Sequence, residues 1–130
     1  VTLTEPSLAD NVITVSAYDA GNNSFYIDSG RGFARGGGLK PDIAAPGVNV
    51  STALGARTGS CMAAAITAGG AAQFMQWAVI EENDVLAQSM EVKAYFVRGA
   101  ARSEDIVYPN RSWGFGRLDL AGTFRVLAEG

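Results

Sequence analysis

The chain has 130 residues, about the size of one domain, and none of its apolar runs approaches the roughly 18 residues needed to span a bilayer. Its residues are 48% apolar and 18% charged, which is typical of a globular protein and excludes a disordered tail. The net charge of −3 gives no electrostatic support for nucleic-acid binding. We therefore expect no nucleic-acid partner and no membrane partner.

Two residue counts limit the available chemistry. The sequence holds one cysteine and no histidine. One cysteine cannot form a disulfide within the chain, so cysteine usage leaves the compartment undetermined. Any Ser–His–Asp or Cys–His arrangement must take its imidazole from outside the chain. A zinc site lacks most of its usual ligands.

The first half of the chain is predicted to form short strands separated by loops. Residues 11–17 are apolar and β-branched, which predicts a buried strand. A turn is predicted over 19–24, followed by a short strand or sheet edge over 25–27. Residues 28–38 are rich in glycine and are predicted to be a loop. A second strand is predicted over 47–51.

The longest helix is predicted over about 61–80, where apolar residues recur at spacings of three and four. Ser60 is the predicted N-cap. The helix is crowded with small residues and contains the pair Gly69-Gly70. Each glycine costs a helix interior about 1 kcal/mol relative to alanine, so the pair predicts that another backbone approaches closely. We expect a central helix buried against a sheet.

The remaining segments complete a mixed pattern. Ser89 is predicted to cap a second helix over about 90–101. A polar loop is predicted over 102–112, then a tight turn over 113–116 and a last short helix over 121–128. Strands mixed with helices indicate an α/β fold.

Three blocks, taken in chain order, carry a family resemblance. The first is Asn11-Val-Ile-Thr-Val together with Ser29-Gly-Arg-Gly, the second is Lys40-Pro-Asp-Ile-Ala-Ala-Pro-Gly, and the third is Gly59-Ser-Cys-Met-Ala. They resemble the subtilisin-like protease (subtilase) family, whose second block reads Lys-Pro-Asp-Ile-x-Ala-Pro-Gly and whose catalytic serine lies in Gly-Thr-Ser-Met-Ala. Trp113-Gly-Phe-Gly-Arg-Leu-Asp is similar to the close of the catalytic domain. With Ala65 in place of proline, the third block is most like clostridial-type subtilases.

The resemblance implies a fold and a domain organisation. We expect a partial subtilisin-like three-layer fold, with a mostly parallel sheet and a central helix after the nucleophile. Residues 1–130 would be the C-terminal part of a subtilase catalytic domain. The family's Asp, His and oxyanion-hole Asn would lie upstream and be absent. The start at Val1, with neither Met nor a basic segment, favours a fragment over a signal peptide.

Cys61 is the candidate nucleophile, because aligning Met62 and Ala63 with the family places it at the catalytic serine. Free backbone N–H groups at a helix start favour developing negative charge, so the N–H of Cys61 is a candidate oxyanion donor. Ser60 is the alternative nucleophile if the register shifts by one. A natural thiol enzyme, a decayed enzyme and an engineered Ser-to-Cys change all remain open.

The resemblance implies that the parent protein is a serine-type endopeptidase, or a thiol variant of one, hydrolysing peptide bonds by nucleophilic acyl transfer. A pseudoprotease kept as a binding or regulatory module is the alternative, and a chance match by an unrelated α/β domain is the third. Because the general base is missing, the chain alone is expected to be inactive. The expected partners are a peptide or protein substrate, the upstream part of the same domain, and further copies of the fragment.

Other candidate sites have weaker support. Asn22, Asn23 and Asp28 are candidate calcium ligands, as calcium is common in the family, but the sequence contains no twelve-residue calcium loop. We therefore expect no metal and no cofactor. Asp42 is predicted to be structural, and the Arg-Gly-rich segment 31–38 to be a loop rather than a nucleic-acid or phosphate site. Trp77 and Trp113 are predicted to be core residues.

Overall fold

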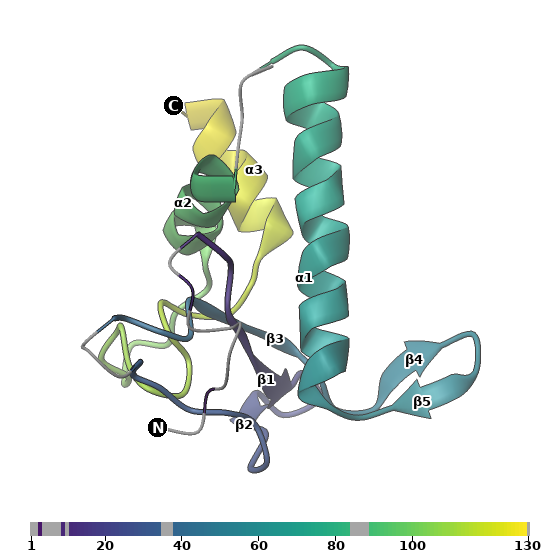
Figure 1. The fold of residues 1–130 in the computed structure, drawn as a ribbon, viewed down its shortest axis with the longest axis vertical. Helices are drawn as coiled ribbons and strands as arrows, with labels where there is room; N and C mark the ends of the chain where they lie inside the picture. Colours follow the sequence, from purple (N-terminus) through teal and green to yellow (C-terminus); the bar gives the residue numbers. More distant parts are fainter. Residues whose placement is uncertain (1–2, 4–8, 10, 35–37, 84–88, 130) are drawn as a thin grey trace.

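The computed structural model describes residues 3, 9, 11–34, 38–83 and 89–129 (Figure 1). Its strands are β1 (Val15–Asp19), β2 (Ser24–Phe25), β3 (Ile43–Pro46), β4 (Val50–Thr52) and β5 (Gly55–Arg57). Its helices are α1 (Ser60–Met75), the π-helical turn η1 (Gln76–Ile80), α2 (Ser89–Gly99) and α3 (Leu120–Glu129). This mixture confirms the α/β class. In the described part of the chain, no helix is both long and apolar enough to cross a membrane.

Strand β1 is the centre of the main sheet. It pairs in parallel with β3, in a register that places Val15 opposite Ile43, and antiparallel with the short strand β2. The predicted strand at 11–17 is therefore right in type but begins later, at Val15. The backbone of Thr14 instead hydrogen-bonds to Asp42. Its N–H donates to Asp42 Oδ2 at 2.7 Å, and its carbonyl accepts the Asp42 N–H at 2.8 Å.

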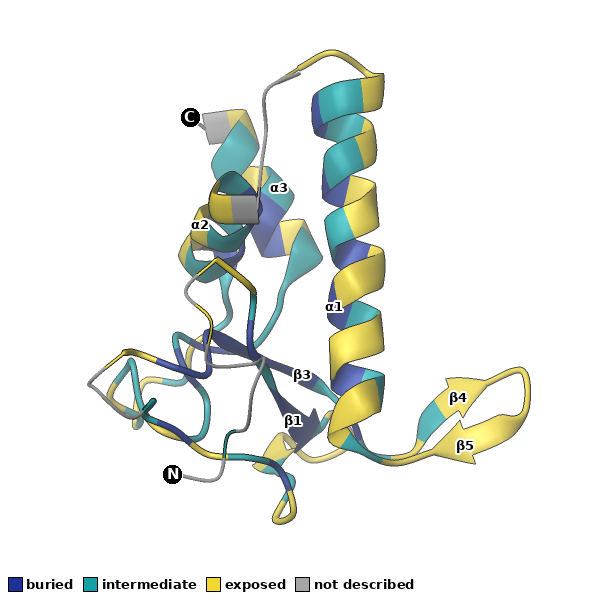
Figure 2. Cartoon of the chain, in the orientation of Figure 1, coloured by how far each residue is buried: buried dark blue, intermediate teal, exposed yellow. Residues whose placement is uncertain are grey.

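The second predicted strand, over 47–51, is only partly right. The structure has β3 before it, at Ile43–Pro46, and only its last two residues belong to a strand, β4, which forms an antiparallel hairpin with β5. Beyond Pro46, Gly47 still donates its N–H to the Tyr18 carbonyl of β1 at 2.9 Å. Figure 2 shows that the β4–β5 hairpin projects from the body and is exposed along almost all of its length.

Helix α1 confirms the long helix predicted from the apolar spacing, although its last turn is π-helical. Its N-cap is Gly59 rather than the predicted Ser60, which is the first helical residue. The backbone of Gly59 lies outside the helical region and no side chain caps the helix. The helix packs on β1 and β3 through one buried face, formed by Ala63, Thr67, Gly70 and Phe74. The opposite face is exposed (Figure 2).

The close backbone approach predicted at Gly69-Gly70 is not found. A Cβ at Gly70 would lie 3.0 Å from the side chain of Leu120, whereas one at Gly69 would meet nothing within 4 Å among the described residues. The close approach lies instead where α2 crosses α3. A Cβ at Gly99 would lie 2.4 Å from Thr123 Cα. These two helices therefore pack backbone against backbone.

The main core lies between the C-terminal half of α1, helix α2 and β3, and its buried residues are Ile43, Phe74, Ala78, Val92 and Phe96. Phe74 and Phe96 are almost fully buried, and each contributes about 1.5–3 kcal/mol through removal from water. Trp77 packs on Phe74 with ring centroids 5.9 Å apart, and Trp113 packs on Tyr18 at 5.5 Å. Trp77 is thus partly buried against the core, close to the prediction, whereas Trp113, also partly buried, packs on Tyr18 outside the main core and was wrongly predicted to be a core residue.

Candidate active site

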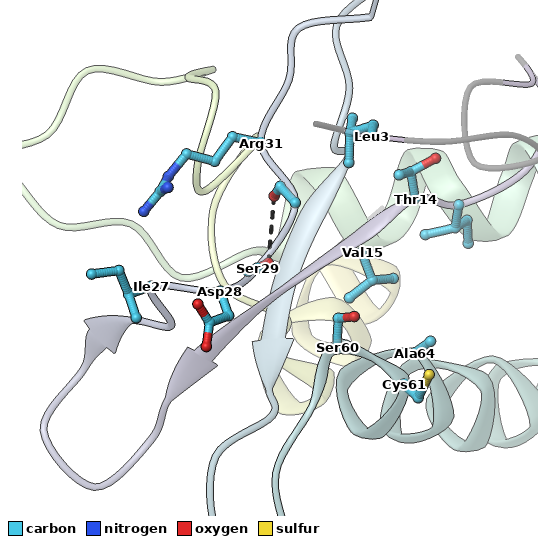
Figure 3. Close-up of a pocket in the computed structure, with 12 residues that line it drawn as sticks. Leu3, Thr14, Val15, Ile27, Asp28, Ser29, Arg31, Ser60, Cys61 and Ala64 are labelled. Atoms are coloured by element: carbon cyan, nitrogen blue, oxygen red, sulfur yellow. Dashed lines mark hydrogen bonds between the residues drawn. The ribbon is translucent and has the colours of Figure 1, made fainter. Parts of the chain in front are cut away.

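Cys61 and Ser60 lie in the first turn of α1, beside a pocket of about 610 Å³ (Figure 3). Leu3 and three longer segments line this pocket: residues 13–15, which lead into β1, the loop 27–31, and the beginning of α1. The pocket thus joins parts of the first and third sequence blocks, which are about thirty residues apart. Cys61 is exposed, so its thiol is accessible from the pocket.

The first turn of α1 offers backbone donors beside the thiol. Met62 donates its N–H to the Gly59 carbonyl at 3.0 Å. Among the described residues, the N–H groups of Ser60 and Cys61 have no hydrogen-bond partner. Free N–H groups at a helix start attract negative charge and can stabilise an oxyanion. The geometry therefore suits a nucleophile whose attack generates an anion.

Backbone contacts hold this turn against the sheet. Gly59 donates its N–H to the Gly47 carbonyl at 2.7 Å. Asn49 donates its N–H to Thr58 Oγ1 at 2.9 Å, which closes the base of the β4–β5 hairpin. The end of β3 and the start of α1 are thus fastened together, although an exposed hairpin separates them in sequence.

The loop 27–31 is anchored by Ser29, which is 4% exposed. Its Oγ accepts the N–H of Ala17 at 2.9 Å and lies 3.4 Å from the Gly30 carbonyl, to which it donates. The guanidinium of Arg31 lies over the ring of Phe25, 4.8 Å from its centroid. This anchoring brings Asp28 and Arg31 to the pocket. Their position at the pocket could not be predicted from the sequence, because it depends on the β1–β2 hairpin and on the stacking of Arg31 on Phe25.

One edge of β1 is open at the pocket. In the parallel pairing with β3, Thr14 bonds towards Asp42 and the neighbouring Val15 directs its backbone groups to the opposite side. Further along that side, Ser29 and Tyr26 satisfy the N–H and carbonyl of Ala17. Among the described residues, no strand pairs with β1 at Val15 on this side. The pocket therefore contains a short unpaired strand edge.

Asp42 lies in a separate buried cluster. It is 1% exposed, and its Oδ2 accepts a hydrogen bond from Lys40 Nζ at 2.8 Å while Lys93 Nζ lies 3.0 Å from Oδ1 in an ion pair. Lys40 also donates to the Val12 carbonyl at 2.7 Å. These groups line a second pocket of about 410 Å³, but their charges are directed at one another. The arrangement agrees with the predicted structural role of Asp42.

Two of the candidate calcium ligands have other roles in the structure. Asn22 Oδ1 accepts hydrogen bonds from the N–H and Oγ of Ser24, and Asp28 lines the pocket beside Cys61. Within the described residues, no group of three or more His, Cys, Asp or Glu side chains could hold a metal ion.

Tyr18 is the packed phenol beneath Trp113, at the end of β1. Burial raises the pKa of Tyr18 above its ordinary value. The charge of Arg117 acts against this shift in pKa, and that of Asp119 adds to it. The phenol is therefore held in its neutral form in the folded protein.

Comparison with known proteins settles the family. The family model described as "Subtilase family" matches residues 1–116. The chain belongs to the subtilase family. The resemblance seen in the sequence is thereby confirmed.

Solved structures agree with this assignment. The subtilase chain is similar to the CspB protease of Clostridium perfringens, with 33% sequence identity, a TM-score of 0.94, and 99% of this chain covered. The match spans only 29% of the CspB chain. The patellamide maturation protease PatA shares the fold at 20% identity and a TM-score of 0.72, over 96% of this chain and 46% of PatA. No curated protein sequence matches the chain. The expected subtilisin-like fold is confirmed, and the chain spans less than half the length of these protease chains.

Proposed function

We propose that this chain is the C-terminal part of a subtilase catalytic domain, and that its parent protein hydrolyses peptide bonds with Cys61 as the nucleophile. One observation carries the proposal. In a chain of the subtilase family, an exposed thiol opens onto a pocket from the first helical turn, beside two N–H groups that have no partner among the described residues. Ser60 lies in the same turn and is the alternative nucleophile.

The proposed reaction is acyl transfer. Cys61 Sγ, having lost its proton to a base, attacks the carbonyl carbon of the scissile peptide bond and forms a C–S bond. The N–H groups at the helix start donate to the carbonyl oxygen as it gains negative charge. The C–N bond then breaks, the amine leaves with a proton, and water hydrolyses the thioester. Because the chain holds no histidine, a histidine base must come from the upstream part of the domain.

The upstream part of the domain is also the proposed partner of the open surfaces. Two open surfaces adjoin the pocket. One is the unpaired edge of β1 at Val15, and the other is the exposed face of α1 at Ala64, Ala65 and Ala68. An open strand edge favours pairing with a further strand, and an exposed helix face of small apolar side chains favours packing against another element. Without that part, the fragment is proposed to self-associate through the same surfaces.

The alternative is a pseudoprotease acting as a binding or regulatory module. The cysteine at the usual serine position favours it, because sulfur is larger than oxygen and such sites tolerate errors of only about 0.5 Å. In that case the pocket would bind a peptide without cleaving it.

Hydrolysis by the full catalytic domain tests the proposal. The wild type, Cys61→Ala and Ser60→Ala are compared on casein and on a fluorogenic peptide. We expect Cys61→Ala to lower kcat by several orders of magnitude, since a triad nucleophile is missing, and Ser60→Ala to have a small effect. The reverse pattern would assign the nucleophile to Ser60. A folded wild type that binds peptide without turnover would favour the pseudoprotease.

A further inference from the structure

We propose that Gly47 is a positioning residue for Cys61. Its lack of a side chain lets the end of β3 hold the beginning of α1 in place through a backbone hydrogen bond. This proposal rests on the assignment of Cys61 as the nucleophile. Gly47 itself does not line the pocket, so it would act only through the residues it fixes.

Gly47 is buried and connects two elements through its backbone. Its N–H donates to the Tyr18 carbonyl at 2.9 Å, which ties it to β1. Its carbonyl accepts the N–H of Gly59 at 2.7 Å, which ties it to the N-cap of α1. Gly59 is two residues before Cys61. Gly47 therefore connects the sheet to the helical turn that carries the Cys61 thiol.

There is no space for a side chain at this position. A Cβ at Gly47 would lie 2.6 Å from Ala17 Cβ and 2.9 Å from the Gly59 carbonyl oxygen. Contacts this short require either β1 or the helix start to move. The Gly59 carbonyl also accepts the Met62 N–H at 3.0 Å, the first hydrogen bond of the helical turn. A displaced Gly59 would therefore carry Cys61 with it.

The exposed hairpin between the two glycines does not supply this constraint. Figure 1 shows β4 and β5 extending away from α1 and the sheet. Residues 51–58 are exposed, and the hairpin is closed at its base by the bond from Asn49 to Thr58. The position of Cys61 is thus set where the hairpin begins and ends, by Gly47 and Gly59.

Alkylation of the thiol tests the proposal. The rate of Cys61 alkylation by iodoacetamide is measured under native conditions for the wild type and for Gly47→Ala. Val92→Ala, which removes a buried side chain of α2, is the destabilised control. The attacking species is the thiolate, and helix N–H groups favour negative charge beside them. We expect Gly47→Ala to slow alkylation about two- to five-fold, the range that a helix terminus contributes. Val92→Ala should lower stability without changing the native rate.

A second variant separates the two short contacts. Ala17→Gly combined with Gly47→Ala removes the contact with Ala17 and leaves only the one with Gly59. If the rate stays slow relative to Ala17→Gly alone, the effect passes through Gly59, as proposed. A rate equal to that of Ala17→Gly alone would overturn the proposal, as would an unchanged rate in Gly47→Ala.

Hydrogen exchange gives a readout on the unmodified chain. The 2.7 Å bond predicts that the Gly59 amide exchanges slowly, and exchange as fast as that of the exposed hairpin tip would overturn the proposal. Neither measurement uses peptide hydrolysis. An inactive parent protein would refute the proposed function without altering these results, whereas a normal thiol rate in Gly47→Ala would refute only the positioning role.

Discussion

The substitution Asp42→Asn removes the charge from a carboxylate that is 1% exposed and that accepts the Thr14 N–H at 2.7 Å. Lys40 Nζ lies 2.8 Å and Lys93 Nζ 3.0 Å from its two oxygens. After the change, the side chain of Lys40, which is 5% exposed, keeps its charge but loses its counter-ion. Among the described residues, its remaining hydrogen-bond partner is the neutral carbonyl of Val12.

The expected cost follows from that unpaired charge. Removing one partner of a buried ion pair destabilises proteins by about 3–5 kcal/mol, whereas typical domains are stable by only about 5–15 kcal/mol. With a urea dependence of about 1–3 kcal/mol per M, the unfolding midpoint should fall by about 1 M or more. Lys93→Met should cost less, because the Lys93 side chain is 23% exposed and Asp42 would keep Lys40.

Urea unfolding followed by tryptophan fluorescence and circular dichroism measures these differences. The matched control is Asp105→Asn, the same chemical change at an exposed carboxylate, which should shift stability by less than about 0.5 kcal/mol. If Asp42→Asn unfolded at the same midpoint as this control, Asp42 would not be the buried structural anion that the geometry indicates.

Three further results are expected. Gly99→Ala should destabilise the chain strongly, because its Cβ would lie 2.4 Å from Thr123 Cα. Gly69→Ala should be neutral or stabilise the chain by up to about 1 kcal/mol, because a Cβ there meets no described atom within 4 Å. Equal unfolding midpoints for the two variants would contradict the close α2–α3 contact. The raised pKa of Tyr18 contributes stability that is fully present below about pH 10 and is lost as the pH rises through the folded pKa. The unfolding free energy of the wild type should therefore fall relative to Tyr18→Phe above pH 10, and parallel pH profiles would refute this. Light scattering of the isolated chain should show dimers or larger species, because the edge of β1 at Val15 is unpaired. A monodisperse monomer at high concentration would contradict the proposed self-association.

The parts of the fold predicted from sequence are those with strong local signals. Helix α1 follows from apolar residues that recur at spacings of three and four over a long stretch. Strand β3 was missed because Ile43–Pro46 is short, has no period and is bracketed by prolines. Its conformation depends on pairing with β1, which is a tertiary interaction.

The candidate site divides in the same way. The sequence could place Cys61 at a helix start, because it lies in a contiguous block whose geometry is determined locally, and its role as nucleophile stays a prediction. Asp28 and Arg31 reach the pocket through the Ser29 anchor and the stacking on Phe25, which join residues far from that block. The placement of Gly47 against Gly59 likewise depends on the sheet, although both glycines were visible in the motifs.

The central claim is that Cys61 is the nucleophile of a catalytic domain completed by upstream residues. Labelling the full domain with a peptidyl chloromethyl ketone, followed by mass spectrometry of the digest, tests it most directly. We predict one peptide adduct, located on Cys61, that blocks turnover and is absent when the chain is treated after denaturation in acid. An adduct on Ser60, or on the upstream histidine that a chloromethyl ketone alkylates at a serine-type site, with Cys61 unmodified and turnover abolished, would contradict the claim.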